Sequence, residues 1–521
     1  MASQPLPDEA TAPDADVPRW WQTNWAIAAA AIAATLPLIG PSIPPLIDVP
    51  GHIGRYRIMA EANSGPLAAH YAVHGALIGN LGIDLAVLAL RPLLDVETAA
   101  HLVVALIPAM LVASMLWLSR EAHGRISPTA GFALPLAYAL PFQFGFVNFV
   151  ASAGLSFIGL ALWLRLARRR ATWVRVAVLV PFAGIVWVCH SFGWAMLGLF
   201  IVGAEWTIQR AHGRSIGRAA LIAAALCAPM AWPQILAILF GTTAGGDTGD
   251  WFDLVSKAQW VASMLRERWK VYDVLCVIVL ALLLWTVIRS KRLSFVPALG
   301  VPALLGLAVF VLLPRLYQGG AYVDMRLLPY VVALGVLAIR VRGTDERLDR
   351  RLANWGFGFF AMRTVTSIVA LALFARDMQA ELPPLSLIPV GSSVFALVNE
   401  PSSASWDNRR LTHIAGLAVA RRRAFTNEQW SIPGQQLIQP LHPSAVPFDR
   451  DPSQLIEPKN LKKATIDFDL AIREFSRADF RYVWTIGFPA GRAHAPDLEP
   501  IWSSDRSALY RVRVPVDRTG R

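Results

Sequence analysis

Long runs of apolar residues recur between residues 25 and 374 of the 521-residue chain and stop beyond them. A run of about 17 or more such residues is long enough to cross the ~30 Å hydrocarbon core of a membrane as a helix. Only 16% of the residues are charged, whereas a soluble protein carries about a quarter. The sequence therefore predicts a polytopic, mainly α-helical membrane bundle of about eleven spans. The runs are 25–43, 99–118, 129–144, 149–166, 174–189, 192–208, 219–240, 272–288, 295–313, 327–339 and 357–374.

Positive charge alternates between the loops that join these runs. The strongly basic loops are 165–175, 210–218, 289–292 and 340–351. They alternate with loops poor in Lys and Arg, at 145–148 and 190–191. Because basic loops stay in the cytoplasm, this pattern predicts a multi-pass inner (plasma) membrane protein with a cytoplasmic N-terminus and an extracytoplasmic C-terminal domain. The net charge of +12 is explained by these loops, and nucleic acid is not expected as a partner.

The span count depends on residues 77–94, which are less hydrophobic and carry Asn80, Asp84 and Arg91. If this segment crosses, the loop before it becomes cytoplasmic and the N-terminus external. A carboxylate at the membrane centre costs about 3 kcal/mol, so we expect an amphipathic helix that lies along the interface. Residues 44–98 then form a first large external loop, and residues 241–271 form a second.

The two ends of the chain differ from the bundle in character. Residues 1–18 are rich in Ala, Pro and Asp and are predicted to be disordered, ahead of a bundle that covers 19–376. They lack the basic region of a signal peptide, so the first helix is expected to be a retained anchor. Residues 377–521, the tail domain, are predicted to be a small extracytoplasmic α/β domain. Its expected strands are 393–398, 482–488 and 508–514, its expected helix is 462–475, and its arginine run 421–423 is interpreted as a solvated face.

Ionisable residues follow the first apolar run directly, in the segment 48–58 (DVPGHIGRYRI). Asp48 is therefore expected at the external interface. If a helix begins here, His52 and Arg55 lie at i and i+3 on one face, close to Asp48. A carboxylate, an imidazole and a guanidinium together suit the deprotonation of an acceptor and the binding of a phosphate. The alternative is an ion pair between Asp48 and Arg55 that only fixes a turn.

This layout resembles the GT-C superfamily of integral-membrane glycosyltransferases, which use polyprenyl-phosphate sugars. In that family an acidic residue lies just past the first helix, juxtamembrane helices follow, and a soluble external domain is often last. Asp48 matches the acidic position, and segments 57–61 and 77–94 resemble the juxtamembrane helices. Many members carry a pair of acidic residues where this chain has Asp48-Val49-Pro50, so the sequence leaves open whether catalysis is retained.

The resemblance implies inverting transfer of a sugar from a polyprenyl-phosphate donor in the membrane to an acceptor on the extracytoplasmic side. Asp48 would be the general base, and the acceptor, whether glycan, lipid or protein, is left open. Either Arg55 or Arg326 would bind the lipid phosphate. Arg326 follows Asp324 at the external start of the tenth run, and the alternative is an interfacial arginine paired with Asp324.

Further polar residues carry weaker signals. Asn80 and Asp84 are four residues apart and would share a helix face, either lining an acceptor groove or capping the helix. The aspartates of 247–253 are spaced loosely like a calcium loop but lack the glycine and glutamate of an EF-hand. No metal site is therefore predicted, and the cofactor, including a divalent cation, is left open.

Two other functions compete with sugar transfer. A transporter or flippase for a polysaccharide or lipid would carry paired charges inside the membrane and inverted repeats. The sequence has few charges within its apolar runs apart from Arg363, and no repeat is evident. The third hypothesis is a non-catalytic membrane assembly protein whose external domain binds a partner.

Overall fold

The protein is described by a computed structural model. It covers residues 18–61, 64–168, 172–241, 246–343, 345–400, 406–407, 410–432, 434–448 and 467–513. The predicted disordered N-terminus therefore lies, apart from residue 18, outside the described residues.

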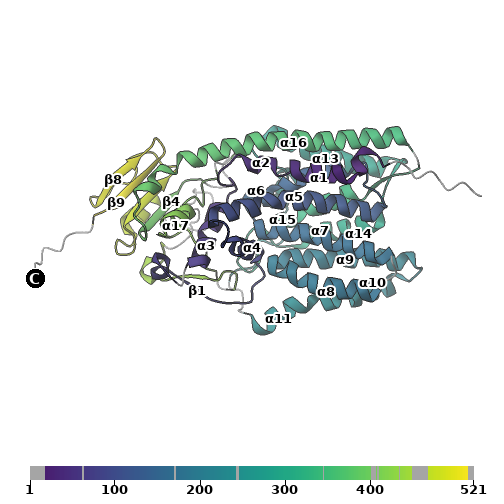
Figure 1. Cartoon of the computed structure of the whole chain (residues 1–521), viewed down its shortest axis with the longest axis horizontal. Helices are drawn as coiled ribbons and strands as arrows, with labels where there is room; N and C mark the ends of the chain where they lie inside the picture. The colour runs from purple at the N-terminus through teal and green to yellow at the C-terminus, as the bar shows by residue number, and fades with distance from the viewer. Residues whose placement is uncertain are drawn as a thin grey trace, which may run out of the picture.

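Helices that run along the longest axis of the molecule form the bundle, and the tail domain lies at one end of it (Figure 1). Seven helical segments are long and apolar enough to cross a membrane, and the other four predicted runs hold shorter helical segments. The polytopic, mainly helical fold is thus confirmed. The bundle helices are α1 Asn24–Ala33, α2 Leu36–Ile39, α5 Val96–His123, α6 Leu140–Phe144, α7 Val147–Arg168, α8 Thr172–Cys189, α9 Ser191–Ala211, α10 Ile216–Cys227, α11 Trp232–Phe240, α13 Lys270–Arg289, α14 Pro297–Leu312, α15 Val323–Leu337 and α16 Glu346–Ala380.

Prolines divide two of the predicted runs. The run 219–240 consists of α10 and α11, with a 3-10 turn at Ala228–Ala231 between them. The run 129–144 consists of the 3-10 turns Ala130–Phe132 and Leu134–Tyr138 followed by α6. Proline has no N–H group to donate within a helix and clashes with the preceding turn, so both segments are broken where proline occurs.

Segment 77–94 contains only one short helix, α4, at Gly82–Leu90. Nine residues of α-helix span about 14 Å, less than half of the hydrocarbon core. This helix packs against α5, α7 and α8 and does not have the length to cross. The helix begins after Asn80, so the predicted shared face of Asn80 and Asp84 is wrong, although the two residues meet in another way described below.

The loop 44–98, predicted to be external, folds onto the tail domain. It contains α3 (Val49–Glu61), a 3-10 turn at Pro66–Ala69 and strand β1 (Tyr71–Val73). β1 pairs antiparallel with β6 (Ile438–Pro440), so a strand of the loop and a strand of the tail share one small sheet. The loop 241–271, also predicted to be external, contains α12, Leu254–Ala262.

A five-stranded mixed sheet forms the centre of the tail domain, in the order β5-β4-β7-β9-β8. β4 is parallel to β5 and β7, and β9 is antiparallel to β7 and β8. The three predicted strands are present, whereas β5 and β8 were not predicted. The predicted helix 462–475 appears as α19, and residues 462–466 lie outside the described residues. The elements are η6 Pro383–Leu387, β4 Ser393–Val398, α17 Gly416–Arg422, β5 Phe425–Thr426, η7 Pro443–Ala445, α19 Phe468–Glu474, β7 Tyr482–Ile486, β8 Leu498–Ser503 and β9 Ser507–Val512.

Glycines let α3 and α17 approach at backbone distance. A Cβ atom added to Gly416 would lie 2.7 Å from the Cα atom of Gly51, and one added to Gly54 would lie 2.9 Å from the carbonyl oxygen of Gly416. Real side chains do not fit at such distances, so glycine is required for this close contact. The tail domain is therefore seated directly on the helix that follows Asp48.

Arginines 421–423 reinforce this contact, and their interpretation as a solvated face is wrong. Arg421 binds Glu97 at the start of α5 with an Nη2–Oε2 distance of 2.9 Å. Arg423 binds Glu61 at the end of α3 at 3.2 Å. The run therefore ties the tail domain to the start of α5 and the end of α3. The residue types alone could not distinguish these ion pairs from a solvated cluster.

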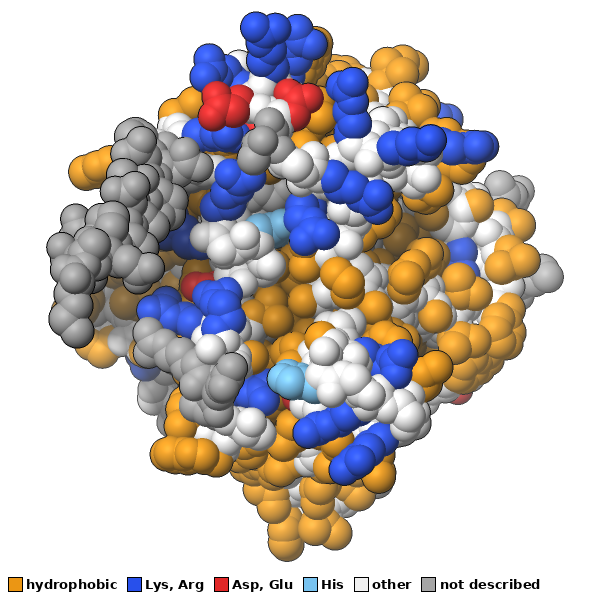
Figure 2. All heavy atoms as spheres, turned by 90° about the vertical axis from the view of Figure 1, so that its right-hand side faces the viewer, with side chains coloured by type: hydrophobic (Ala, Val, Ile, Leu, Met, Phe, Trp, Pro, Cys, Tyr) orange, Lys and Arg blue, Asp and Glu red, His pale blue; other side chains and the backbone are white. Residues whose placement is uncertain are grey.

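The end of the bundle that lies away from the tail domain is basic. Lys and Arg side chains gather on this face with few acidic ones between them (Figure 2). Among them are Arg125, Arg168 and Arg292, whose side chains are largely exposed. Strands β2 (Leu293–Phe295) and β3 (Ile339–Val341) form an antiparallel pair between two of the predicted basic loops.

Candidate functional site

Backbone contacts at the start of α3 fix the position of Asp48. Its N–H donates to the carbonyl oxygen of Phe144 at 2.9 Å, and its own carbonyl accepts the N–H of His52 at 2.9 Å, which closes the first turn of the helix. Gly145 lies close beside it in a left-handed conformation with φ 90°. The side chain of Asp48 is 15% exposed, so the carboxylate is mostly buried but reachable.

Residues of the tail domain meet Asp48. The Nε2 atom of His413 lies 3.6 Å from Oδ1 of Asp48, and its Nδ1 atom lies 3.1 Å from Oε1 of the fully buried Glu428. The Trp430 ring packs on His413, with 4.6 Å between centroids, and approaches His52 at 5.4 Å. These three tail residues were not predicted from the sequence, because no local motif links them to Asp48.

His52 is close to Asp48, as predicted, and is held as a neutral imidazole. Its Nε2 lies 3.2 Å from the carbonyl oxygen of Gly145, which can only accept, so Nε2 carries the hydrogen. Burial, together with nearby Arg55 and His413, holds the pKa of His52 well below its usual range. Its Nδ1 atom is buried and has no hydrogen-bond partner within the described part of the chain.

Arg55 forms a buried ion pair with Asp84. The Nε–Oδ1 distance is 2.8 Å and the Nη2–Oδ2 distance is 3.0 Å, and both residues are almost fully buried. Asn148 donates to Oδ2 of Asp84 at 2.9 Å and to Oδ1 of Asn80 at 3.1 Å. Asn80 and Asp84 are therefore brought together by Asn148 of α7 and not by a shared helix face. The charge of Arg55 is compensated by Asp84, so the predicted turn-fixing pair with Asp48 is replaced by a pair between α3 and α4.

Arg326, the other predicted cation, is half-buried on aromatic rings near the start of α15. Its guanidinium lies 3.9 Å from the centroid of the Phe146 ring, and Nη1 lies 3.4 Å from Nε2 of His190. Asp48 acts on it electrostatically. Among the described residues no carboxylate lies within 4.0 Å of the guanidinium, and its buried Nε has no hydrogen-bond partner.

Asp324 does not pair with Arg326, so the alternative of an interfacial pair between them is wrong. Its carboxylate instead accepts from Nζ of the buried Lys257 in α12 at 3.0 Å. The same ammonium group donates to the carbonyl oxygens of Phe310 and Leu313 at 2.9 and 2.8 Å. Asp324 thus fastens α12 across the end of α14, beside the turn that carries Arg326.

An apolar cavity of about 740 Å³ lies near this polar cluster. It is lined by side chains from α4, α5, α7, α8 and α11, among them the exposed Leu85, Leu106 and Ile185. Cys189 lines one part of it and is followed by His190, which contacts Arg326. The cavity therefore opens on the outer surface of the bundle, and its wall at Cys189 is one residue away from the His190 that contacts Arg326.

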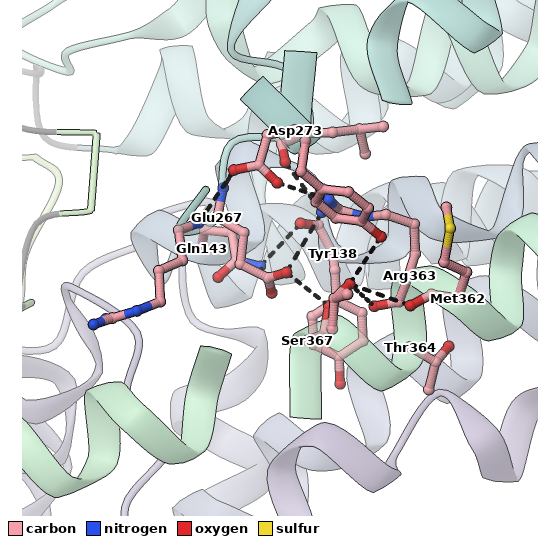
Figure 3. A network of polar contacts seen from close by, with 12 residues as sticks. Tyr138, Gln143, Glu267, Asp273, Met362, Arg363, Thr364 and Ser367 are labelled. Atoms are coloured by element: carbon pink, nitrogen blue, oxygen red, sulfur yellow. Dashed lines mark hydrogen bonds and ion pairs between the residues drawn. The ribbon is translucent and has the colours of Figure 1, made fainter. Parts of the chain in front are cut away.

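A second polar cluster surrounds Arg363, in the middle of α16 (Figure 3). Its guanidinium binds Asp273 at 2.7 Å and Glu267 at 3.5 Å. Ser367 and Gln143 each donate to the Glu267 carboxylate at 3.0 Å. All five residues are buried, and every charged one has an opposite partner within the cluster.

The described residues contain no group of three or more His, Cys, Asp or Glu side chains arranged to hold a metal ion. In the loop with the loosely calcium-like spacing, Asp253 accepts the N–H of Ser256 at 3.0 Å and caps α12. The role of this aspartate is therefore helix capping.

The fold and the polar cluster around Asp48 describe a polytopic helical membrane protein with a polar site where the bundle meets loop 44–98 and the tail domain. No protein-family model matches the chain, and the search of curated proteins found no match. Among solved structures, the chain is similar to the crystal structure of ArnT from Cupriavidus metallidurans bound to undecaprenyl phosphate, with 14% sequence identity and a TM-score of 0.46. The match covers 93% of this chain and 97% of that chain.

Proposed function

We propose that this protein is a membrane glycosyltransferase that moves a sugar from a polyprenyl-phosphate donor to an acceptor hydroxyl group. The observation that carries the proposal is Arg326, a half-buried guanidinium that interacts electrostatically with Asp48 and has no ion-pair partner among the described residues. A partly buried cation is stabilised by an anion that makes several hydrogen bonds to it. The phosphate of a lipid donor would supply that anion.

The apolar cavity supports a lipid donor. Its lining residues are almost all apolar, which suits a hydrocarbon chain and not a free sugar phosphate. From Cys189 in the cavity wall, the chain continues to His190 and its contact with Arg326. A polyprenyl chain in the cavity would therefore place its phosphate beside the guanidinium, with the attached sugar toward Asp48.

The chemistry is a single displacement. The carboxylate of Asp48 removes the proton from the acceptor hydroxyl, the acceptor oxygen forms a bond to the sugar C1 atom, and the bond from C1 to the phosphate oxygen breaks. The electron pair leaves with the polyprenyl phosphate, whose charge Arg326 binds. One displacement inverts the configuration at C1. An acceptor bound beside His52 would donate a hydrogen bond to its Nδ1 atom, which is buried and has no partner among the described residues.

Arg55, Asn80, Asp84 and Asp324 take supporting roles in this proposal, because each is bonded to another part of the protein. The pair of Arg55 and Asp84 holds α3 against α4, and Asp324 holds α12. Substrate contact is assigned to Asp48, His52 and Arg326.

The orientation follows from the basic face of the bundle (Figure 2). If that face is cytoplasmic, as the positive-inside rule requires, the site and the tail domain are extracytoplasmic. Cysteine labelling at Ser64, in the first external loop, tests this orientation. An impermeant reagent added to intact cells should label S64C, and labelling only after membrane disruption would contradict it.

The decisive test replaces the base. Asp48→Asn, expressed in a host deletion strain, should abolish the sugar modification of the envelope, measured by mass spectrometry, because a general base contributes about 10²- to 10⁴-fold to rate. Asp469→Asn is the matched control, since Asp469 is an exposed tail carboxylate bound to Arg492. Equal amounts of both variants in the membrane are required. A glycan that persists in Asp48→Asn would contradict the transferase proposal.

A flippase or transporter is the second candidate, because the structure contains buried charge pairs of the kind that hypothesis predicts. Arg363 binds Asp273 and Glu267, and Arg175 binds Glu205 at 2.6 Å. The same experiment separates the two functions. Lipid translocation without sugar transfer would not need a base at Asp48 and would survive Asp48→Asn.

A further inference from the structure

His413 stands between two carboxylates that come from different parts of the fold. Its Nε2 atom lies 3.6 Å from Asp48, and its Nδ1 atom lies 3.1 Å from Glu428. We propose that Asp48, His413 and Glu428 form a proton relay through which the tail domain takes the acceptor proton away from the base. This inference rests on the proposed transferase function. It makes His413 and Glu428 positioning residues, since they act through Asp48.

Glu428 sets the tautomer of His413. The Glu428 carboxylate is fully buried and accepts from Nε2 of Gln429 at 3.0 Å as well as facing Nδ1 of His413. A carboxylate can only accept, so Nδ1 carries a hydrogen in this arrangement. In the neutral imidazole the lone pair is then on Nε2, the atom that faces Asp48.

The proton then has a downhill path. An ordinary carboxyl group has a pKa of about 4 and an ordinary imidazole one of about 6.5, so a proton taken up by Asp48 moves favourably to Nε2 of His413. The resulting imidazolium is stabilised by Glu428, and Asp48 returns to its charged form for the next turnover. The 3.6 Å separation is longer than a hydrogen bond, as catalytic contacts often are before substrate binds.

The other charged or titratable groups near the relay favour this direction. On the α3 side, His52 is held neutral by burial and by nearby Arg55 and His413, which keep its pKa low, so it does not compete for the proton. From α15, Arg326 acts on Asp48 and favours its carboxylate form. The Trp430 ring covers His413 and limits water at the imidazole.

The relay lies at the close contact between α3 and α17, where the tail domain docks on the bundle. A Cβ atom added to Gly51 of α3 would overlap Oε1 of Glu428, and one added to Gly416 of α17 would lie 2.8 Å from its Oε2. Glu428 therefore occupies the narrow space between the two helix backbones. Only the docked tail domain completes the relay.

The first test needs no substrate. The full chain, in lipid nanodiscs and with ¹⁵N in the rings of its ten histidines, is titrated by NMR, and His413→Gln assigns the signal. We expect the Nδ1–H tautomer, and a titration midpoint lowered by about one unit in Asp48→Asn and in Glu428→Gln, because each change removes a negative charge beside the imidazole. Glu499→Gln, which alters an exposed tail carboxylate bound to Arg513, is the control. A midpoint unmoved by both variants would overturn the relay.

The second test uses host membranes, which contain the native donor and acceptor. Transfer is measured by mass spectrometry between pH 5.5 and 8.5. His413→Gln should reduce the rate about tenfold or more, short of the loss at Asp48 itself, and should remove the fall in rate that protonation of His413 causes at low pH. His494→Gln, at an exposed tail histidine, should behave like the wild type. If His413→Gln keeps the wild-type rate and pH profile, the relay is wrong while the transferase proposal stands. If the wild type itself shows no transfer, the transferase proposal fails, and the relay as a catalytic device fails with it.

Discussion

Two arginines of the bundle, Arg363 of α16 and Arg326 of α15, have opposite surroundings. Arg363, fully buried in α16, is bound by Asp273 and Glu267. Arg326, half-buried near the start of α15, rests on the ring of Phe146 and has no carboxylate within ion-pair distance in the described residues. A buried charge is tolerated when it is paired. The balanced cluster therefore holds helices together, and the unbalanced cation is suited to a charge that arrives with the substrate.

Removal of Arg363 should have the largest effect on stability. Arg363→Met leaves two buried carboxylates without their cation, and breaking a buried pair in this way costs about 3–5 kcal/mol. Thermal unfolding in detergent measures this loss. Arg376→Met is the control on the same helix, because the side chain of Arg376 is 73% exposed. If the two variants unfold alike, the Arg363 cluster does not stabilise the bundle.

Removal of Arg326 should instead affect binding. Arg326→Met is expected to weaken binding of undecaprenyl phosphate about 10²-fold, since hydrogen bonds to charged groups contribute about 1.5–3 kcal/mol. Its unfolding temperature should stay close to that of the wild type, because no carboxylate loses a partner. Native mass spectrometry of the full chain measures the binding, and Arg292→Met at the basic end is the control. Unchanged affinity, or unfolding as severe as in Arg363→Met, would remove the contrast between the two arginines.

A smaller effect on stability is expected at the close contact between α3 and α17, which lies outside the surroundings of Arg363 and Arg326. In Gly416→Ala the added Cβ atom would overlap the carbonyl oxygen of Pro50 and lie 2.7 Å from the Cα atom of Gly51. Both are backbone atoms, which cannot rotate away as the end of a side chain can. We expect the tail domain to lose about 1–3 kcal/mol of docking stability, as overpacking does in protein cores. Hydrogen exchange should then rise in α17 and α3 but not around Arg363. Gly358→Ala is the control, because a Cβ atom there meets nothing within 4 Å.

The smallest effect concerns pH. Because the pKa of His52 is depressed in the folded protein, the unfolded state binds more protons below about pH 6.5, the ordinary imidazole value. The contribution of neutral His52 to the free energy of unfolding is therefore fully present above that pH. Below it, the free energy of unfolding falls by up to about 1.4 kcal/mol per pH unit. Thermal unfolding between pH 7.5 and 5.5 measures the slope. His52→Gln should have a shallower slope, and an identical slope would show that His52 does not cause it.

Part of this architecture could be predicted from the sequence. The helical membrane bundle and the sheet-containing tail domain are confirmed, because hydrophobic run length and strand composition are local properties. Segment 77–94 is too short in helix to cross, as its charges indicated. Strands β5 and β8 were missed, since β5 has two residues and β8 begins with Leu-Glu-Pro.

The candidate site, too, could be predicted from the sequence only in part. The sequence by itself determined that Asp48 lies at the end of the first membrane segment, because the residue follows the first apolar run directly. Only the tertiary structure decided which partners each charge has. Arg55 pairs with Asp84 across α3 and α4, while His413 and Glu428 reach Asp48 from the tail domain. The physical reason is that membrane insertion depends on the residues of one segment, whereas ion pairing and burial depend on segments brought together by packing.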